Sequence, residues 1–223
     1  MSAERQNARG AAPRRTARAG WAPFEMLADR YDTWFDGARG RGVFRVEAEC
    51  VRQLLSGLPR PWLEVGVGTG RFAAALGVEA GVDPARAALR IARRRGISAR
   101  RGTAESLPYR DGIFGAVVMI VTVCFLREPS RAFRECARVL RPGGRLIVGI
   151  VPRNSSWGRA YARKGAEGHP FYSTARFYTV REIVTAAGRS GFDLDSASSW
   201  LLEPYSGEVR QNAEPVPGEG PES

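Results

Sequence analysis

Residues 62–84, WLEVGVGTGRFAAALGVEAGVDP, carry the strongest structural signal in the chain. It contains an apolar strand, a turn with glycines at 66, 68 and 70, an alanine-rich helix, and a second short strand that ends in Asp83. Glycines in such a turn let the backbone approach a ligand closely and adopt conformations that a Cβ atom would forbid. The stretch therefore predicts a turn that holds a ligand with an adenosine group.

Strands and helices alternate after Pro61, which is typical of a parallel sheet covered by helices on both faces. The sequence predicts strands at 62–67, 79–83, 97–101, 114–121 and 144–151, and a last strand at 192–202. It predicts helices at 70–77, 84–95, 129–139 and 179–188, the last of them capped by Thr179. We therefore expect an α/β fold, Rossmann-like and doubly wound, with a mostly parallel sheet.

Composition predicts one ordered domain between two disordered ends. Residues 1–20 carry five Arg without apolar periodicity, and residues 203–223 are polar and rich in Pro, Gly and Glu. We therefore expect a basic arm at 1–20, a domain at 21–202 and an acidic tail at 203–223.

Charge and cysteine usage narrow the class of protein. The net charge of +11 suggests a nucleic-acid partner, but a solvated basic surface explains it as well and is favoured. Cys50, Cys124 and Cys136 have no CxxC spacing, and His169 is the only histidine, so we expect free thiols and no metal site. The longest apolar run, 116–126, is too short for a membrane span and no signal peptide is visible, so we expect a cytoplasmic protein.

The glycine-rich turn departs from the dinucleotide-binding fingerprint, because Arg71 stands where the third glycine of GxGxxG belongs. What stands here is E-x-G-x-G-x-G, from Glu64 through Gly66 and Gly68 to Gly70. This motif resembles the first motif of the class I S-adenosylmethionine-dependent methyltransferases. The resemblance implies that the turn cradles the methionine end of S-adenosylmethionine and that Glu64 receives its ammonium group.

Further segments resemble the same family. Asp83 ends the second strand, where a carboxylate can bind both ribose hydroxyls, although it could instead cap the helix that follows Pro84. The stretch GTAESLPY resembles the family loop that lines the adenine, which implies cofactor contacts for Ala104 and Glu105, with a further contact at Val121.

Two residues near this loop differ from the family pattern, and one further stretch matches it. Thr103 stands where the family usually has Asp, which puts one adenine contact in question, and Gly115 replaces an Asp after Phe114. The stretch RVLRPGG at 138–144 matches the turn before the fifth strand in the methyltransferase type 11 group.

The resemblance also implies where the methyl acceptor binds. It implies a helical lid at 21–60, in which Tyr31 would contact the cofactor, and a substrate-recognition insertion at 152–178. Within the insertion, His169 is the side chain that titrates near neutrality and is a candidate general base. The candidate acceptor-side residues are His169, Tyr172 and Arg176.

The family sheet normally closes with a seventh, antiparallel strand between the fifth and the sixth. No apolar run after 192–202 can supply it, so we expect this strand to be missing. An open sheet edge invites association, and we therefore expect a homo-oligomer unless another segment fills the gap.

These motifs predict an enzyme that transfers a methyl group from S-adenosylmethionine to a small-molecule acceptor by in-line displacement. Such a reaction depends on proximity and orientation and needs no nucleophile from the protein. Three alternatives stay open: an oxidoreductase with a dinucleotide, against which Arg71 argues; an RNA methyltransferase, suggested by charge; and a catalytically idle cofactor-binding protein.

Overall fold

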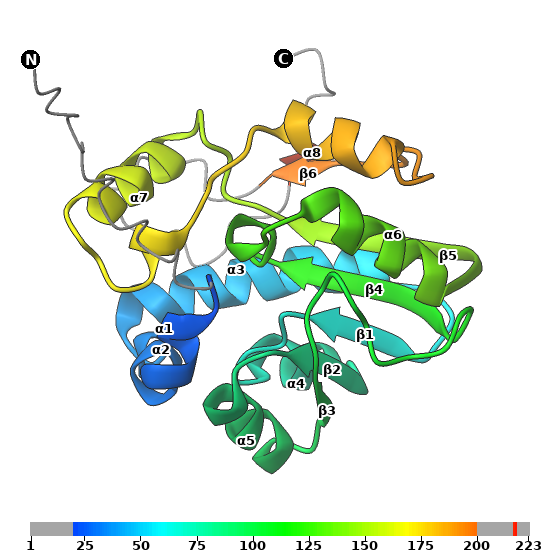
Figure 1. Ribbon diagram of the computed structural model, residues 1–223, viewed down its shortest axis with the longest axis horizontal. Helices are drawn as coiled ribbons and strands as arrows, with labels where there is room; N and C mark the ends of the chain where they lie inside the picture. The colour runs from blue at the N-terminus through cyan, green and yellow to red at the C-terminus, as the bar shows by residue number, and fades with distance from the viewer. Residues whose placement is uncertain (1–19, 200–215, 218–223) are drawn as a thin grey trace, which may run out of the picture.

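The computed structural model describes residues 20–199 and 216–217. Its centre is a five-stranded parallel sheet in the order β3-β2-β1-β4-β5 (Figure 1). The strands are β1 (Trp62–Val65), β2 (Ala80–Asp83), β3 (Ser98–Arg101), β4 (Phe114–Ile120) and β5 (Leu140–Gly149). The predicted doubly wound, mostly parallel sheet is confirmed. Its order reverses between β1 and β4, and folds of this kind bind ligands at the carboxyl ends of the strands beside such a reversal.

Helices flank this sheet and cover its carboxyl end. They are α1 (Ala22–Met26), α2 (Ala28–Trp34), α3 (Ala38–Leu55), α4 (Arg71–Leu76), α5 (Arg86–Arg94), α6 (Pro129–Val139), α7 (Ser156–Ala166) and α8 (Val180–Gly188), with the short 3-10 helices η1 (Val123–Phe125) and η2 (Tyr172–Thr174). Thr179 caps α8 as expected and forms a capping box with Glu182. No helix among the described residues is long and apolar enough to cross a membrane.

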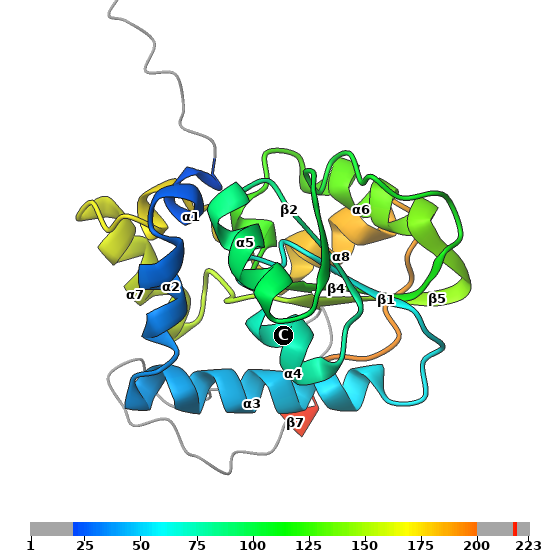
Figure 2. The same cartoon turned by 90° about the horizontal axis from the view of Figure 1, so that it is seen from below.

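The sheet separates two apolar cores. Along β4, Val118 and Ile120 join the core that contains residues of α3, α4 and α5, whereas Val117 and Met119 join the core that contains residues of α6 and α8. This alternation follows from the two-residue period of a strand. Figure 2 shows α3 and α4 on one face of the sheet and α6 and α8 on the other.

The carboxyl ends of the strands face three helices from distant parts of the sequence. In both views α1, α2 and α7 lie together at this end of the molecule (Figures 1 and 2). Helix α3 buries Ala48, Val51 and Leu55 in the core, so it is a core helix. We call α1 and α2 together, Ala22–Trp34, the lid.

The predicted strand at 192–202 is wrong as a strand of the main sheet. Within the described residues only Ser198–Ser199 (β6) is extended there, and it pairs antiparallel with Val216–Pro217 (β7). This segment lacks the apolar run that a buried strand needs, and its Asp195 is held by an ion pair to Arg145 of β5. Of the predicted tail at 203–223 the structure describes only β7, and the rest of that tail and residues 1–19 lie outside the described residues.

Candidate functional site

The glycine-rich turn, residues 66–70, leaves β1 and enters α4. Gly66, Gly68 and Gly70 have φ angles of +77°, +51° and +78°, in the left-handed region that favours glycine. A Cβ atom at Gly66 would lie 2.4 Å from the side chain of Thr122, whereas a Cβ atom at Gly68 would meet nothing within 4 Å. The turn therefore presents bare backbone and open space at Gly68.

Asp83 holds this turn in place. Its Oδ2 accepts a hydrogen bond of 3.0 Å from the backbone N–H of Gly68, and its Oδ1 accepts one of 2.8 Å from Ala85. Burial raises the pKa of Asp83 to about 6, although these two hydrogen bonds act in the opposite direction. The carboxylate thus holds both the turn and Ala85, the N-cap residue of α5, which begins at Arg86, and its remaining lone pairs can accept further hydrogen bonds.

Glu64 is a buried carboxyl group with an unused oxygen. Its side chain lies on β1 and the residue is 3% exposed, and Oε2 has no hydrogen-bond partner among the described residues. Burial raises the pKa of Glu64 to about 8, and the charge of Asp83 adds to this shift. Buried polar atoms are normally paired, so an unpaired carboxyl oxygen indicates a place for a donor or a cation.

Tyr31 joins the lid to the insertion. Its ring centroid lies 5.1 Å from that of Phe24, 5.4 Å from Phe35 and 5.6 Å from Phe171, in edge or tilted contacts. Burial raises the pKa of Tyr31 well above its usual range, and the negative charge of Glu47 adds to the shift. The neutral hydroxyl therefore lies among acidic groups beneath an aromatic cover.

The other predicted cofactor residues lie around the ends of β3 and β4. Ala104 is buried, and Glu105 accepts a hydrogen bond of 3.2 Å from the backbone N–H of Arg127. Val121 has a φ of +51°, which is a strained conformation for a β-branched residue, and its N–H donates to the carbonyl of Gly149 at 2.8 Å. Strain of this kind is common at functional sites, which is consistent with the cofactor contact expected for Val121.

The structure brings two of the three predicted acceptor-side residues together. The ring of His169 stacks on that of Tyr172, with centroids 4.5 Å apart, and Tyr172 stacks on Tyr161 at 4.3 Å. Nδ1 of His169 is buried and finds no hydrogen-bond partner in the described part of the chain. Arg176 is exposed and lies over the ring of Tyr178 at 5.1 Å, so its guanidinium does not join this stack.

The pKa of His169 is lowered by burial, then by the positive charges of Lys164 and Arg30. The imidazole is therefore neutral at pH 7 and can accept a proton. Among the described residues, no three His, Cys, Asp or Glu side chains are grouped so that they could hold a metal ion.

The sequence reasoning missed two features of this site. Glu47 is buried on the inner face of α3, next to Val46, and an acid within an apolar stripe was a signal that could have identified it. Asp32 of the lid contacts two arginines and a threonine that lie far away in the sequence, and no local pattern indicated this.

Comparison with known proteins agrees with this geometry. A family model described as Methyltransferase domain, of type 11, matches residues 63–148. An uncharacterized protein of Mycobacterium tuberculosis is 42% identical over 177 residues, which are 79% of this chain and 62% of that protein. An uncharacterized methyltransferase of the same organism is 38% identical over 185 residues, covering 80% of this chain and 67% of that protein. The chain thus spans less than two thirds of the first of these relatives.

A crystal structure from Thermotoga maritima, described as a SAM-dependent methyltransferase and possible histamine N-methyltransferase, superposes with a TM-score of 0.77. It is 35% identical, and the match covers 90% of this chain and 93% of that one. The motifs, the fold and these similarities agree with one another. The chain belongs to the class I S-adenosylmethionine-dependent methyltransferases of type 11, and its cofactor is S-adenosylmethionine.

Proposed function

We propose that this chain transfers a methyl group from S-adenosylmethionine to a small-molecule acceptor. The observation that carries the proposal is the arrangement at the carboxyl end of the sheet. There the turn has open space at Gly68 and is bound to the lid through Thr69 and Asp32, and the unpaired carboxyl oxygen belongs to Glu64, whose charge acts on Tyr31 of the lid. Open backbone and a buried acid fit a ligand that brings a cationic ammonium group to this place.

The residues predicted to hold the cofactor fit its chemistry. Glu64 would accept its ammonium group, the turn at 66–70 would follow its methionine end, and Asp83 would accept from its ribose hydroxyls. Ala104, Glu105 and Val121 would border the adenosine, and the ring of Tyr31 would face the positive charge. When bound, the cofactor supplies an electrophilic methyl group on a sulfonium.

The protein's own contribution is to orient the acceptor, to exclude water and to accept a proton. Holding the acceptor in the right orientation can lower the activation free energy by about 7 to 11 kcal/mol. The aromatic rings of the lid pack against Phe171 of the insertion, and such a cover would exclude water from a cofactor bound at the strand ends. We assign the proton-accepting role to the neutral imidazole of His169, with Tyr172 orienting it by the stacked contact.

The acceptor side supports a compact organic substrate. We place the acceptor between the lid and the insertion, where the ring centroids of Phe24, Tyr31 and Phe171 lie 5.1 to 5.6 Å apart and the ring of His169 stacks on Tyr172. The Thermotoga maritima structure is described as a possible histamine N-methyltransferase. Small amines with an aromatic ring are therefore the first acceptors to try, followed by phenols, thiols and quinones.

The experiment is a transfer assay with S-adenosylmethionine labelled in its methyl group, over panels of these acceptors and over RNA. The matched control is Asp83→Ala, which removes the hydrogen bond from Gly68 of the turn and the one from Ala85 before α5. We expect label in a small amine or phenol with the unaltered chain and none with the control. Label in RNA alone, or cofactor binding without transfer to any panel, would contradict the proposal.

A further inference from the structure

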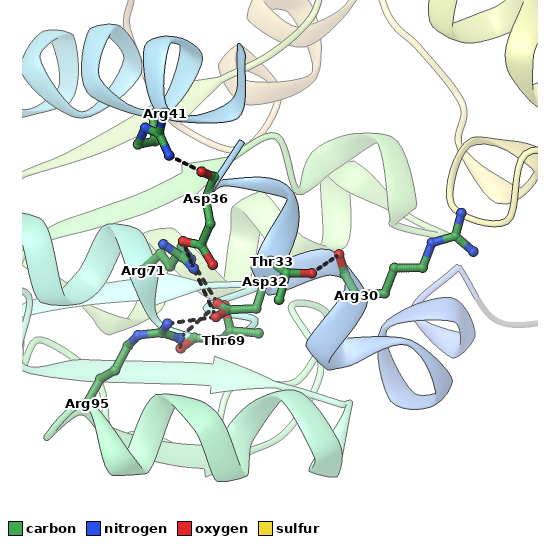
Figure 3. Close-up of polar contacts among 8 residues, drawn as sticks. All are labelled: Arg30, Asp32, Thr33, Asp36, Arg41, Thr69, Arg71 and Arg95. Atoms are coloured by element: carbon green, nitrogen blue, oxygen red, sulfur yellow. Dashed lines mark hydrogen bonds and ion pairs between the residues drawn. The ribbon is translucent and has the colours of Figure 1, made fainter. Parts of the chain in front are cut away.

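Asp32, in the lid, is held by two arginines at once (Figure 3). Its Oδ1 accepts hydrogen bonds of 3.0 Å from Nε of Arg71 and 2.9 Å from Nη1 of Arg95. Its Oδ2 accepts hydrogen bonds of 3.1 Å from Nη2 of Arg71 and 2.8 Å from Nη2 of Arg95. Each guanidinium therefore binds the carboxylate in a two-pronged manner, which is the strong and directional form of this pair.

The same carboxylate reaches the glycine-rich turn itself. Oγ1 of Thr69, between Gly68 and Gly70, donates to Oδ1 of Asp32 at 2.6 Å, and Nη1 of Arg95 donates to the backbone carbonyl of Thr69 at 2.7 Å. Thr69 is buried, so this contact is shielded from water. The lid is thus tied to the turn through a side chain and through the backbone.

The residues that contact Asp32 belong to different helices, so this carboxylate connects the lid to the rest of the fold. Arg71 is the first residue of α4, Arg95 is the C-cap of α5, and Asp32 lies on α2, so one carboxylate joins three elements. A second, weaker contact is made by Glu25 of α1, which accepts a hydrogen bond of 3.2 Å from the backbone N–H of Ala87. Through Glu25 and through Asp32, the lid is therefore attached to α5.

The charge of Asp32 is well compensated in this closed arrangement. Its side chain is 15% exposed; this partial burial alone would raise its pKa, but hydrogen bonds from Arg95, Arg71 and Thr69 outweigh burial and lower the pKa to about 2. An amide at this position would accept hydrogen bonds through one oxygen and would leave the two guanidinium groups without their shared counter-charge.

Asp32 follows Tyr31 directly, and Tyr31 is the lid residue that we assign to the cofactor. A group that fixes α2 against Thr69 therefore fixes the distance between Tyr31 and the turn. A ligand under the lid leaves when α2 moves away, and that motion breaks the hydrogen bonds of Asp32. We propose that Asp32 is a positioning residue that sets the rate at which the lid releases the cofactor. This inference rests on the proposed function of the same site.

Trp34 provides a reporter for this motion. It is the last residue of α2 and is 42% exposed, so its fluorescence changes when the lid moves from one environment to another. The experiment follows the release of S-adenosylhomocysteine, the demethylated product of the cofactor, by stopped-flow fluorescence. The variant Trp34→Phe removes the signal and so assigns it to the lid.

The test variant is Asp32→Asn, and the matched control is Asp29→Asn. Asp29 lies in the first turn of the same helix and is exposed, so the control makes the same change of charge without touching the arginines. We expect Asp32→Asn to raise the release rate and the KM for S-adenosylmethionine by about tenfold, because charge-assisted hydrogen bonds are lost. Asp32→Glu keeps the charge, so its release rate and KM should lie between those of the unaltered chain and those of Asp32→Asn. Asp29→Asn should leave both quantities within about twofold of the unaltered chain.

The result that overturns the inference is a folded Asp32→Asn variant with a lowered melting temperature but an unchanged release rate. If Asp32→Asn does not fold, Arg95→Gln carries the same test, since it keeps the pair of Asp32 with Arg71. Failure of the unaltered chain to bind S-adenosylhomocysteine counts against the proposed function. A change in release rate confined to the Asp32 and Arg95 variants supports the role assigned to Asp32.

Discussion

Asp83 and Gly68 are joined by a hydrogen bond of 3.0 Å, in which the backbone N–H of the glycine donates to Oδ2 of the carboxylate. The bond connects the end of β2 to the turn that follows β1, so the two neighbouring strands of the sheet together shape the turn that we assign to the cofactor. The carboxylate that we assign to the ribose is therefore also the group that keeps the turn in its left-handed conformation.

The first prediction concerns Asp83. In Asp83→Asn the charge disappears and one accepting oxygen becomes a donor, so we expect the affinity for S-adenosylmethionine to fall at least about tenfold. Calorimetric titration measures this change. Asp195→Asn is the control, because that aspartate is exposed and pairs with Arg145 on the outer strand. Equal affinities for the Asp83 variant and the unaltered chain would contradict the assignment.

The second prediction separates backbone strain from ligand contact. Gly68 and Gly143 have φ angles of +51° and +76°, and a Cβ atom at either would meet nothing within 4 Å. Alanine at either site should therefore cost about 1 to 2 kcal/mol of unfolding free energy, measured with denaturant. We expect Gly68→Ala alone to lose cofactor binding, because its methyl group enters the cradle. Cofactor binding by Gly68→Ala as tight as by Gly143→Ala would show that the cradle lies elsewhere.

The third prediction is a pH dependence of the ligand-free protein. The pKa of Glu64 rises from an ordinary 4.5 to about 8 on folding. Between these values the folded state holds a proton that the unfolded state has lost, so raising the pH lowers stability across this interval. Melting temperatures recorded from pH 5 to pH 8 should fall because of this group, and Glu64→Gln should flatten the curve. An equally steep curve for Glu64→Gln would count against the raised pKa.

Cofactor binding should act on the same group. An ammonium group beside Glu64 favours the charged carboxylate, so binding at pH 7 should release a proton. Titrations in two buffers of different ionisation enthalpy measure the number of protons released. The count should drop in Glu64→Gln, and a proton uptake by the unaltered chain would contradict the placement of the ammonium group.

The fourth prediction concerns the acceptor side. His169→Gln should lower kcat by about a hundredfold or more on an acceptor that must lose a proton. It should leave the affinity for S-adenosylmethionine unchanged, since the imidazole stacks on Tyr172 of the insertion and is not among the residues that we assign to the cofactor. Arg176→Gln is the comparison, because its guanidinium lies over Tyr178 instead. Full turnover by His169→Gln would remove the general-base role.

The strands of the sheet and the helices around it were predictable where a local sequence pattern determines the structure. Residues 129–139 form a helix with the predicted bounds, because Pro129 suits a first helical position and the apolar residues recur at helical spacing. Strand β5 was harder: it begins at Leu140, before the two glycines that suggested a turn, and its register against β4 shifts between Phe114 and Ala116. Glycine is common both in turns and in irregular strands, so the sequence alone could not show which of the two forms at Gly143 and Gly144.

The cradle was predictable for a similar reason. The positive φ angles of Gly66 and Gly68 and the hydrogen bond from Gly68 to Asp83 lie within residues 62–84, so this short stretch predicted the shape of the turn, while its cofactor contacts stay a prediction. The cluster around Asp32 was not predictable, because it forms when the lid folds onto two helices that are about 40 and about 60 residues away in the sequence. Contacts of that range depend on the complete fold and leave no local periodicity.

A calorimetric titration of the unaltered chain with S-adenosylmethionine, set beside Gly68→Ala and Gly143→Ala, tests whether the glycine-rich turn holds the methyl donor. We predict one binding site per chain with a dissociation constant in the micromolar range, kept in Gly143→Ala and lost in Gly68→Ala. The absence of binding by the unaltered chain at millimolar cofactor, or equal binding by both variants, would contradict the claim that the glycine-rich turn holds the methyl donor.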